Sequence, residues 1–196
     1  MIPALILILS AVVYRIAAVF LIQSGQAAWL GNFAPLAAIA LCGAVYFPPK
    51  LKFTVPLGAL FLSDLFLNYR YGASLVQPEM IGHYLGLFLV GLIGLALQNR
   101  ASFKALLPAS ILGSTVFYLI TNTFSWLSDP GYAKNFAGLI QALTVGLPQY
   151  SATPTWMFFR NTLLSDLFFT LVFVACMNIG RQTSRGRAGA ALPRVA

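Results

Sequence analysis

Charged residues are scarce in this 196-residue chain. Only 8% of its residues are charged, and only four are acidic, whereas 59% are apolar and the mean hydropathy is +0.83. Soluble domains carry about 25% charged and 45–50% apolar residues. A soluble fold of this length could not bury so much apolar surface. The composition therefore predicts an integral membrane protein, with the lipid bilayer as its solvent and partner.

Residue types typical of catalytic or metal-binding sites are also few. The two cysteines, Cys42 and Cys176, stand in apolar segments without a CxxC spacing, which argues against a disulfide framework or a zinc site. A single histidine, His83, excludes a Ser–His–Asp triad or a multi-histidine metal site within one chain, and a packing role is favoured for it over that of a base. The chain has no GxxxxGK[ST] phosphate loop and no Gly-x-Gly-Asp motif of membrane aspartyl proteases. We expect no enzyme activity, no cofactor and no bound metal.

The net charge of +8 does not indicate nucleic acid, because the basic residues lie between apolar segments and in the C-terminal tail. Eight of them lie in every second loop and in the tail, so that six spans with both termini on one side place all eight on that side. These residues are Lys50, Lys52, Arg100, Lys104, Arg181, Arg185, Arg187 and Arg194. By the positive-inside rule, both termini are expected in the cytoplasm.

A helix needs about 20 apolar residues to cross roughly 30 Å of hydrocarbon. The segments that meet this need are 3–22, 31–47, 52–69, 80–97, 105–125 and 159–178. The predicted fold is therefore an all-α bundle of six transmembrane helices within residues 1–180. In the fourth segment, Gly82 and Gly86 have the small-xxx-small spacing of close helix packing.

The two polar segments outside these spans differ in character. The external loop 126–158, with a short surface helix expected within 134–147, is either a lid over a binding site or a plain connector. The basic tail 181–196 is expected to be disordered and to contact anionic lipid.

Three charged residues lie deep within the spans, although burying such a side chain in lipid costs about 2.5 kcal/mol or more. The letters LSDLF occur at 62–66 and again at 164–168, and they carry Asp64 and Asp166. A rise of about 1.5 Å per residue places both aspartates and Arg15 at similar depths. One aspartate could pair with Arg15 as a structural ion pair, or both could face a pocket. The repeated letters could mark an inverted repeat or arise by chance.

Other polar residues gather toward the external end of the spans. Asn68 follows Asp64 by one helical turn, and Thr162 and Thr170 share a face with Asp166. A polar stripe runs along the fifth span, and two further polar residues stand at the same end: Ser110, Ser114, Tyr118 and Asn122 form the stripe, with Asn32 and Trp126 beyond it. This pattern predicts an outward-facing pocket for a small molecule.

Four stretches of the chain also resemble a known family: NFAPLAAIALCGAVYF, LSDLFLN, STVFYLITNTFSWL and NTLLSDLFF. They resemble an uncharacterised bacterial family assigned to transport, which is similar to the substrate-binding S components of energy-coupling factor transporters. The resemblance implies a six-helix protein that captures a vitamin, a vitamin precursor or a metal ion, and that docks on a transmembrane T component driven by ATPases. The pocket positions it implies are Asn32, Asp64, Asn122, Trp126, Asn161 and Asp166.

One feature of that family is missing. S components often carry a small-xxx-small docking motif on their first helix, whereas here Ala11 is followed four residues later by Arg15. The chain could therefore act without an energy-coupling module. The alternative function is a six-helix membrane scaffold, such as those of cell-shape machinery, which would use its polar groups for helix association.

Overall fold

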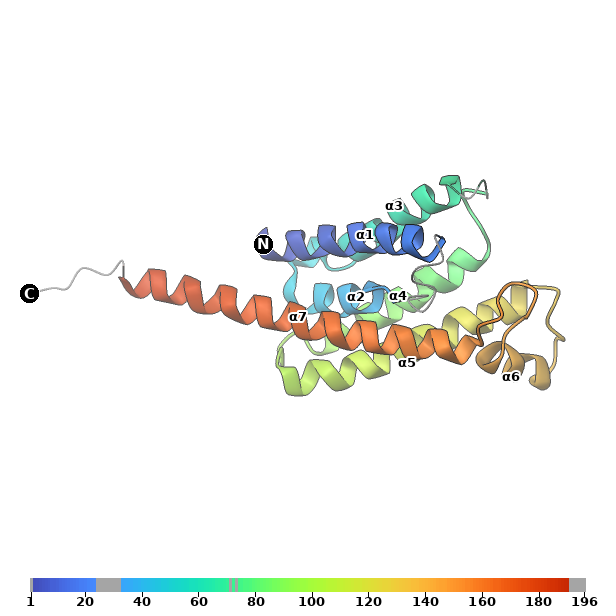
Figure 1. Ribbon diagram of the computed structural model, residues 1–196. Helices are drawn as coiled ribbons and strands as arrows, with labels where there is room; N and C mark the ends of the chain where they lie inside the picture. The colour runs from blue at the N-terminus through green and yellow to red at the C-terminus, as the bar shows by residue number, and fades with distance from the viewer. Residues whose placement is uncertain (1, 24–32, 71, 73, 191–196) are drawn as a thin grey trace, which may run out of the picture.

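The computed structural model describes residues 2–70, 72 and 74–190, apart from the segment 24–32. Within these ranges every regular element is a helix (Figure 1), so the predicted all-α class is confirmed for this part of the chain. The elements are α1 (Ile2–Gln23), α2 (Leu36–Tyr46), the 3₁₀ turn η2 (Pro49–Leu51), α3 (Thr54–Arg70), α4 (Glu79–Ala96), α5 (Phe103–Ser128), α6 (Phe136–Thr144) and α7 (Thr155–Ala190).

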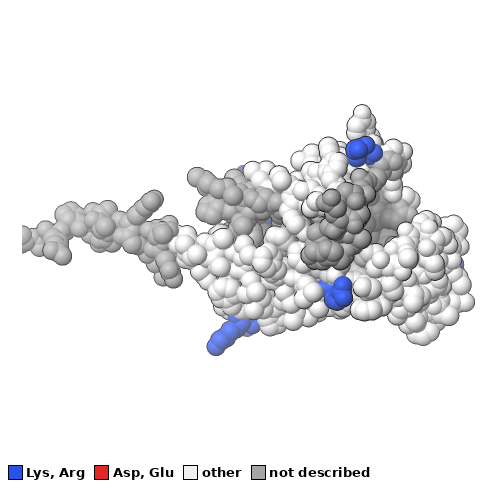
Figure 2. Space-filling model, in the orientation of Figure 1, with Lys and Arg blue, Asp and Glu red and all other residues white. Residues whose placement is uncertain are grey.

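Three of the described segments have the length and composition of a membrane crossing. These segments are Pro49–Arg70, Phe103–Ser128 and Thr155–Gly180, and shorter apolar helices run over Val12–Leu21, Leu36–Tyr46 and Met80–Ala96. Large apolar side chains point outward from the bundle, as Leu62 does with 66% of its surface exposed. The face drawn in Figure 2 shows a few basic side chains and no acidic one. These features indicate association with a membrane.

Helix α2 is short and lies in the middle of the bundle. Its 11 residues span about 16 Å, half of a hydrocarbon crossing. Pro35 is its N-cap residue and the chain leaves helical geometry at Phe47, because a residue that precedes a proline disfavours the α conformation. Every residue from Ala37 to Ala44 is buried. The described helix is therefore shorter than the expected span 31–47, of which residues 31 and 32 lie outside the described part.

Glycines allow α4 to pack closely against two neighbours. A Cβ atom added at Gly82 or Gly86 would lie 2.7–2.8 Å from Phe124 or Phe117 of α5, and one added at Gly94 would collide with the backbone carbonyl of Leu41 in α2. This contact confirms the close packing predicted from the small-xxx-small spacing. Helix α4 is thereby fixed between α5 and α2.

Helix α7 extends well beyond the bundle (Figure 1). Its 36 residues correspond to about 54 Å. The expectation of a disordered tail from residue 181 is wrong for residues 181–190, which continue the helix. Adding residues to an existing helix avoids the cost of nucleation, so a polar tail can follow the preceding apolar segment. Residues 191–196 lie outside the described part.

The connection between α5 and α7 is folded. Helix α6 forms within the expected segment 134–147, and the side chain of Asn135 caps it by accepting a hydrogen bond of 2.9 Å from the Gly138 amide. Trp126 donates a hydrogen bond of 2.8 Å from Nε1 to the Ala133 carbonyl and packs against a small buried cluster. That cluster consists of Tyr132, Ala142 and Leu147. The connection is therefore an ordered layer on α5 and α7.

Candidate functional site

A cavity of about 180 Å³ lies where α5 ends and α7 begins, on the N-terminal side of α2. Side chains from α1, α3, α4, α5 and α7 contribute to its wall, together with the first turn of α2. Because α2 starts halfway through the bundle, the space beyond its N-terminal end is not filled by a helix and forms this cavity. The described lining consists of Arg15, Ala34, Leu36, Ala37, Leu60, His83, Phe117, Tyr118, Thr121, Asn122, Thr155, Phe158 and Thr162.

One charged residue in this wall is Arg15, which forms an ion pair with Asp64. Arg15 Nη2 lies 2.7 Å from Asp64 Oδ1, and Nη1 donates a hydrogen bond to the hydroxyl of Ser63. The two charged side chains are only 18% and 11% exposed. Of the two aspartates that depth suggests as partners, the structure thus pairs Arg15 with Asp64. Asp64 Oδ2 is buried and has no hydrogen-bond partner among the described residues, so the carboxylate depends on Arg15.

Asp166 lies beneath the first turn of α2, outside the described lining of the cavity. It is 1% exposed, and its Oδ1 accepts a hydrogen bond of 2.9 Å from the Ala38 amide. Its Oδ2 accepts one of 2.8 Å from the Ser114 hydroxyl. The N-cap residue of α2, Pro35, provides no side-chain cap. Asp166 therefore caps α2 from a different helix, where the helix dipole and the free amides favour a negative group.

The polar stripe on α5 serves two purposes. Its first two members face α7, where the Ser114 hydroxyl reaches Asp166 and the Thr170 hydroxyl donates to Ser110 Oγ over 3.2 Å. Its last two members, Tyr118 and Asn122, belong to the cavity wall. The stripe thus continues from a buried polar contact into the cavity.

Tyr118 also connects the wall to α6. Its hydroxyl donates a hydrogen bond to the carbonyl of Leu143, and its ring lies 4.6 Å from that of Phe159. From the segment 126–158, expected to act as a lid or a connector, the described lining includes only Thr155 and Phe158. Helix α6 therefore supports the wall from behind, through Tyr118.

Several lining residues were missed in the sequence. His83, which was expected to pack, does stack on Phe117 with ring centroids 6.1 Å apart, and it also faces the cavity. Thr162 was singled out in the sequence, and Thr155 and Phe158 precede it at the spacing of one helix face, so the start of α7 carried a detectable signal. Other apolar lining residues, such as Leu60, gave no such signal because they resemble lipid-facing ones.

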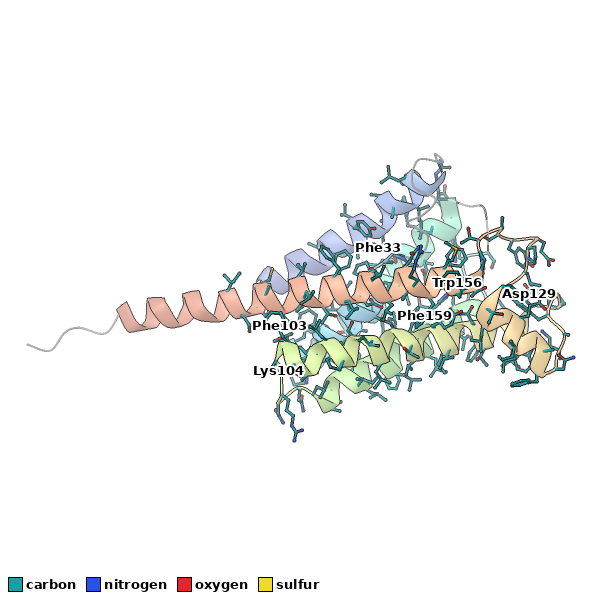
Figure 3. All side chains as sticks on the ribbon, turned by 60° about the horizontal axis from the view of Figure 1, so that its bottom comes forward. Phe33, Phe103, Lys104, Asp129, Trp156 and Phe159 are labelled. Carbon is teal, nitrogen blue, oxygen red and sulfur yellow. The ribbon has the colours of Figure 1, made fainter. Side chains whose placement is uncertain are left out.

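The remaining expected site residues lie elsewhere. Asn32 falls outside the described residues. Asn68 Nδ2 donates a hydrogen bond of 3.3 Å to the Leu75 carbonyl just beyond α3. Asn161 is buried, and its Oδ1 accepts a hydrogen bond of 3.2 Å from Arg160. The expected residues outside the described lining are Asp64, Asn68, Trp126, Asn161 and Asp166. Phe33, before α2, lies between α1 and α7, where its ring contacts Phe169 (Figure 3).

The described residues contain no group of three or more His, Cys, Asp or Glu side chains that could hold a metal ion. Comparison with curated proteins gives no match, and comparison with solved structures gives none. The family of unknown function DUF6580 matches residues 1–187, nearly the whole chain. The chain therefore belongs to the family DUF6580.

Proposed function

We propose that this chain captures a small molecule for uptake across a bacterial plasma membrane, in the manner of the S component of an energy-coupling factor transporter. The observation that carries the proposal is the cavity, which gathers Arg15, His83 and Asn122 within the helix bundle. Polar groups at this depth are costly unless water or a ligand reaches them. A transmembrane T component with ATPases would supply energy, since the chain has no phosphate loop of its own.

The proposed topology has six spans with both termini in the cytoplasm. Two loops expected on the cytoplasmic side meet in the structure, because Lys52 Nζ donates a hydrogen bond to Gln98 Oε1. Lys104 lies at the end of the bundle opposite to Asp129 and Trp156 (Figure 3). Helix α1 begins at the end from which α7 projects (Figure 1). These placements support one strongly basic side and one side with few basic residues.

Reporter fusions test this topology. Fusions at residues 50, 101 and 190 should be cytoplasmic, whereas fusions at 72 and 140 should be external, because basic loops are retained inside. Alkaline phosphatase, active only outside, and a green fluorescent protein, fluorescent only inside, give complementary readouts at each position. Reversed results at any two positions would contradict the six-span arrangement.

An uptake experiment tests transport for a substrate that has not been identified. Cells that produce the chain together with a T component and its ATPases are supplied with a mixture of small solutes, and depletion of each solute from the medium is followed by mass spectrometry. We expect at least one solute to disappear faster than in cells without the chain. The variant Thr121→Phe should abolish the difference, because a phenyl group at Thr121 would occupy the cavity.

The matched control is Thr115→Phe on the same helix. Thr115 lies outside the described lining, and its hydroxyl bonds only within the helix, to the Ile111 carbonyl over 2.8 Å. This variant should transport normally. If neither the unmodified chain nor the control depletes any solute, while both are produced and folded, the scaffold function is favoured instead.

A further inference from the structure

We infer that the cavity binds a small organic anion built on one flat ring, rather than a cation or a metal ion. The inference deepens the proposed function and rests on it for the role of the bound molecule in uptake. The binding itself depends only on the charge and shape of the wall, and it can be measured separately.

The charge of the wall comes from Arg15. Asp64, Asp129 and Asp166 are the acidic residues whose side chains the structure describes, and none of them belongs to the described lining. Asp64 pairs with Arg15, but its other oxygen, Oδ2, is buried, and Asp64 is not part of the described lining. A solute therefore meets the cationic member of the pair first. The fourth acidic residue, Glu79, is the first residue of α4, and its side chain lies outside the described part.

The guanidinium of Arg15 retains hydrogen-bonding capacity for a ligand. It carries five N–H donors, and its bonds to Ser63 and Asp64 occupy two of its nitrogens. Hydrogen bonds between a guanidinium and a carboxylate are charge-assisted and are strengthened in an interior of low dielectric. A metal ion or an ammonium group would instead need carboxylate or carbonyl oxygens, and Asn122 Oδ1 is the only side-chain amide oxygen in the described lining.

The shape of the wall favours a flat ring. Phe117, Tyr118 and Phe158 line the cavity, and His83 stacks on Phe117 at an interplanar angle of 27°. The volume is about 180 Å³, and an apolar cavity of roughly 150 Å³ is known to hold one benzene molecule. One substituted ring therefore fits this volume. Aromatic walls and a single cation together describe an aromatic or heteroaromatic carboxylate.

Three probes of one shape and different charge test the inference: benzoate, benzamide and benzylamine. Each is titrated into the full chain purified in detergent, and binding is followed by melting temperature and by calorimetry. We expect benzoate to bind at least about tenfold more tightly than benzamide, since only the carboxylate forms charge-assisted hydrogen bonds. Benzylamine should bind most weakly. Tighter binding of benzylamine than of benzoate, or no binding of any probe, would overturn the inference.

A substitution in the wall should invert this preference. Asn122→Asp keeps the side-chain shape and adds a carboxylate to the lining. The affinity for benzoate should therefore fall by about tenfold, and the affinity for benzylamine should rise by a similar factor. Gln149→Glu makes the same chemical change at an exposed position of the loop after α6 and should leave all three affinities unchanged. An unchanged preference in Asn122→Asp would contradict the inference even if the unmodified chain binds benzoate.

The experiments distinguish a failure of the anion site from a failure of the transport function. Binding of benzoate by a chain that depletes no solute from the medium would leave the anion site standing and remove the transport function. Depletion of solutes that is blocked by Thr121→Phe, combined with no preference for benzoate, would remove only the inference about charge.

Discussion

Arg15→Ala is expected to destabilise the purified chain severely, whereas the double variant Arg15→Gln/Asp64→Asn should recover a large part of the loss. Removing one member of a buried ion pair leaves the other charge uncompensated, which costs about 3–5 kcal/mol. Asp64 has no second partner among the described residues, because its Oδ2 makes no hydrogen bond there. In the double variant neither side chain carries a charge, so no uncompensated charge is left in the bundle. Thermal unfolding in detergent measures the difference.

Two further variants make this result specific. Asp64→Asn alone should also destabilise, because it leaves Arg15 without its anion in the bundle. Arg70→Ala, which removes a charge from the exposed end of α3, should change the melting temperature little. If the effects of Arg15→Gln and Asp64→Asn simply add, the two residues do not interact and the ion pair has no role in stability.

The second large effect is expected at Asp166. Asp166→Ala should loosen α2, because it leaves the Ala38 amide without its acceptor, whereas the Ser114 hydroxyl can still donate to the Ser110 carbonyl. Each unsatisfied buried group costs about 1–3 kcal/mol. Asp166→Asn should be much milder, since its amide oxygen can still accept from Ala38 and its amide nitrogen can donate to the hydroxyl of Ser114.

Cys42 reports on this change directly, because it lies on α2 and is fully buried. In a background with Cys176→Ser, a maleimide should label Asp166→Ala much faster than the unmodified chain or Asp166→Asn. Asp129→Ala, in the loop after α5, serves as the control and should leave Cys42 protected. Equal labelling of Asp166→Ala and Asp166→Asn would mean that Asp166 does not hold α2 through these hydrogen bonds.

The positions of the helices were largely predictable, because lipid permits few solutions. A segment that must satisfy its backbone without water becomes a helix, and its apolar length marks where it lies. The expected segments 52–69 and 80–97 differ from α3 and α4 by at most two residues at either end. The start of α2 and the end of α7 were less predictable. A proline determines the first, and the continuation of a helix into polar sequence determines the second.

The candidate site was predictable only in part. Tyr118 and Asn122 were found because a four-residue repeat on one helix is visible in the sequence. The role of Asp166 was not visible, since its capping contact with Ala38 joins residues 128 positions apart. For His83 the sequence predicted only a packing role. Its position in the cavity wall was not predictable, because a single side chain carries no periodicity that would show which way it faces.

The short length of α2 has a consequence for how binding sites of this kind could change. The space above Leu36 exists because one helix stops halfway, and the surrounding helices remain packed along its buried length. Adding a turn to α2 at its N-terminal end would plug the volume, and removing one would enlarge it. Either change would leave the contacts of α4 with α5, made through Gly82 and Gly86, in place. Ligand size could thus change with the length of α2, while the packing of α4 against α5 is preserved.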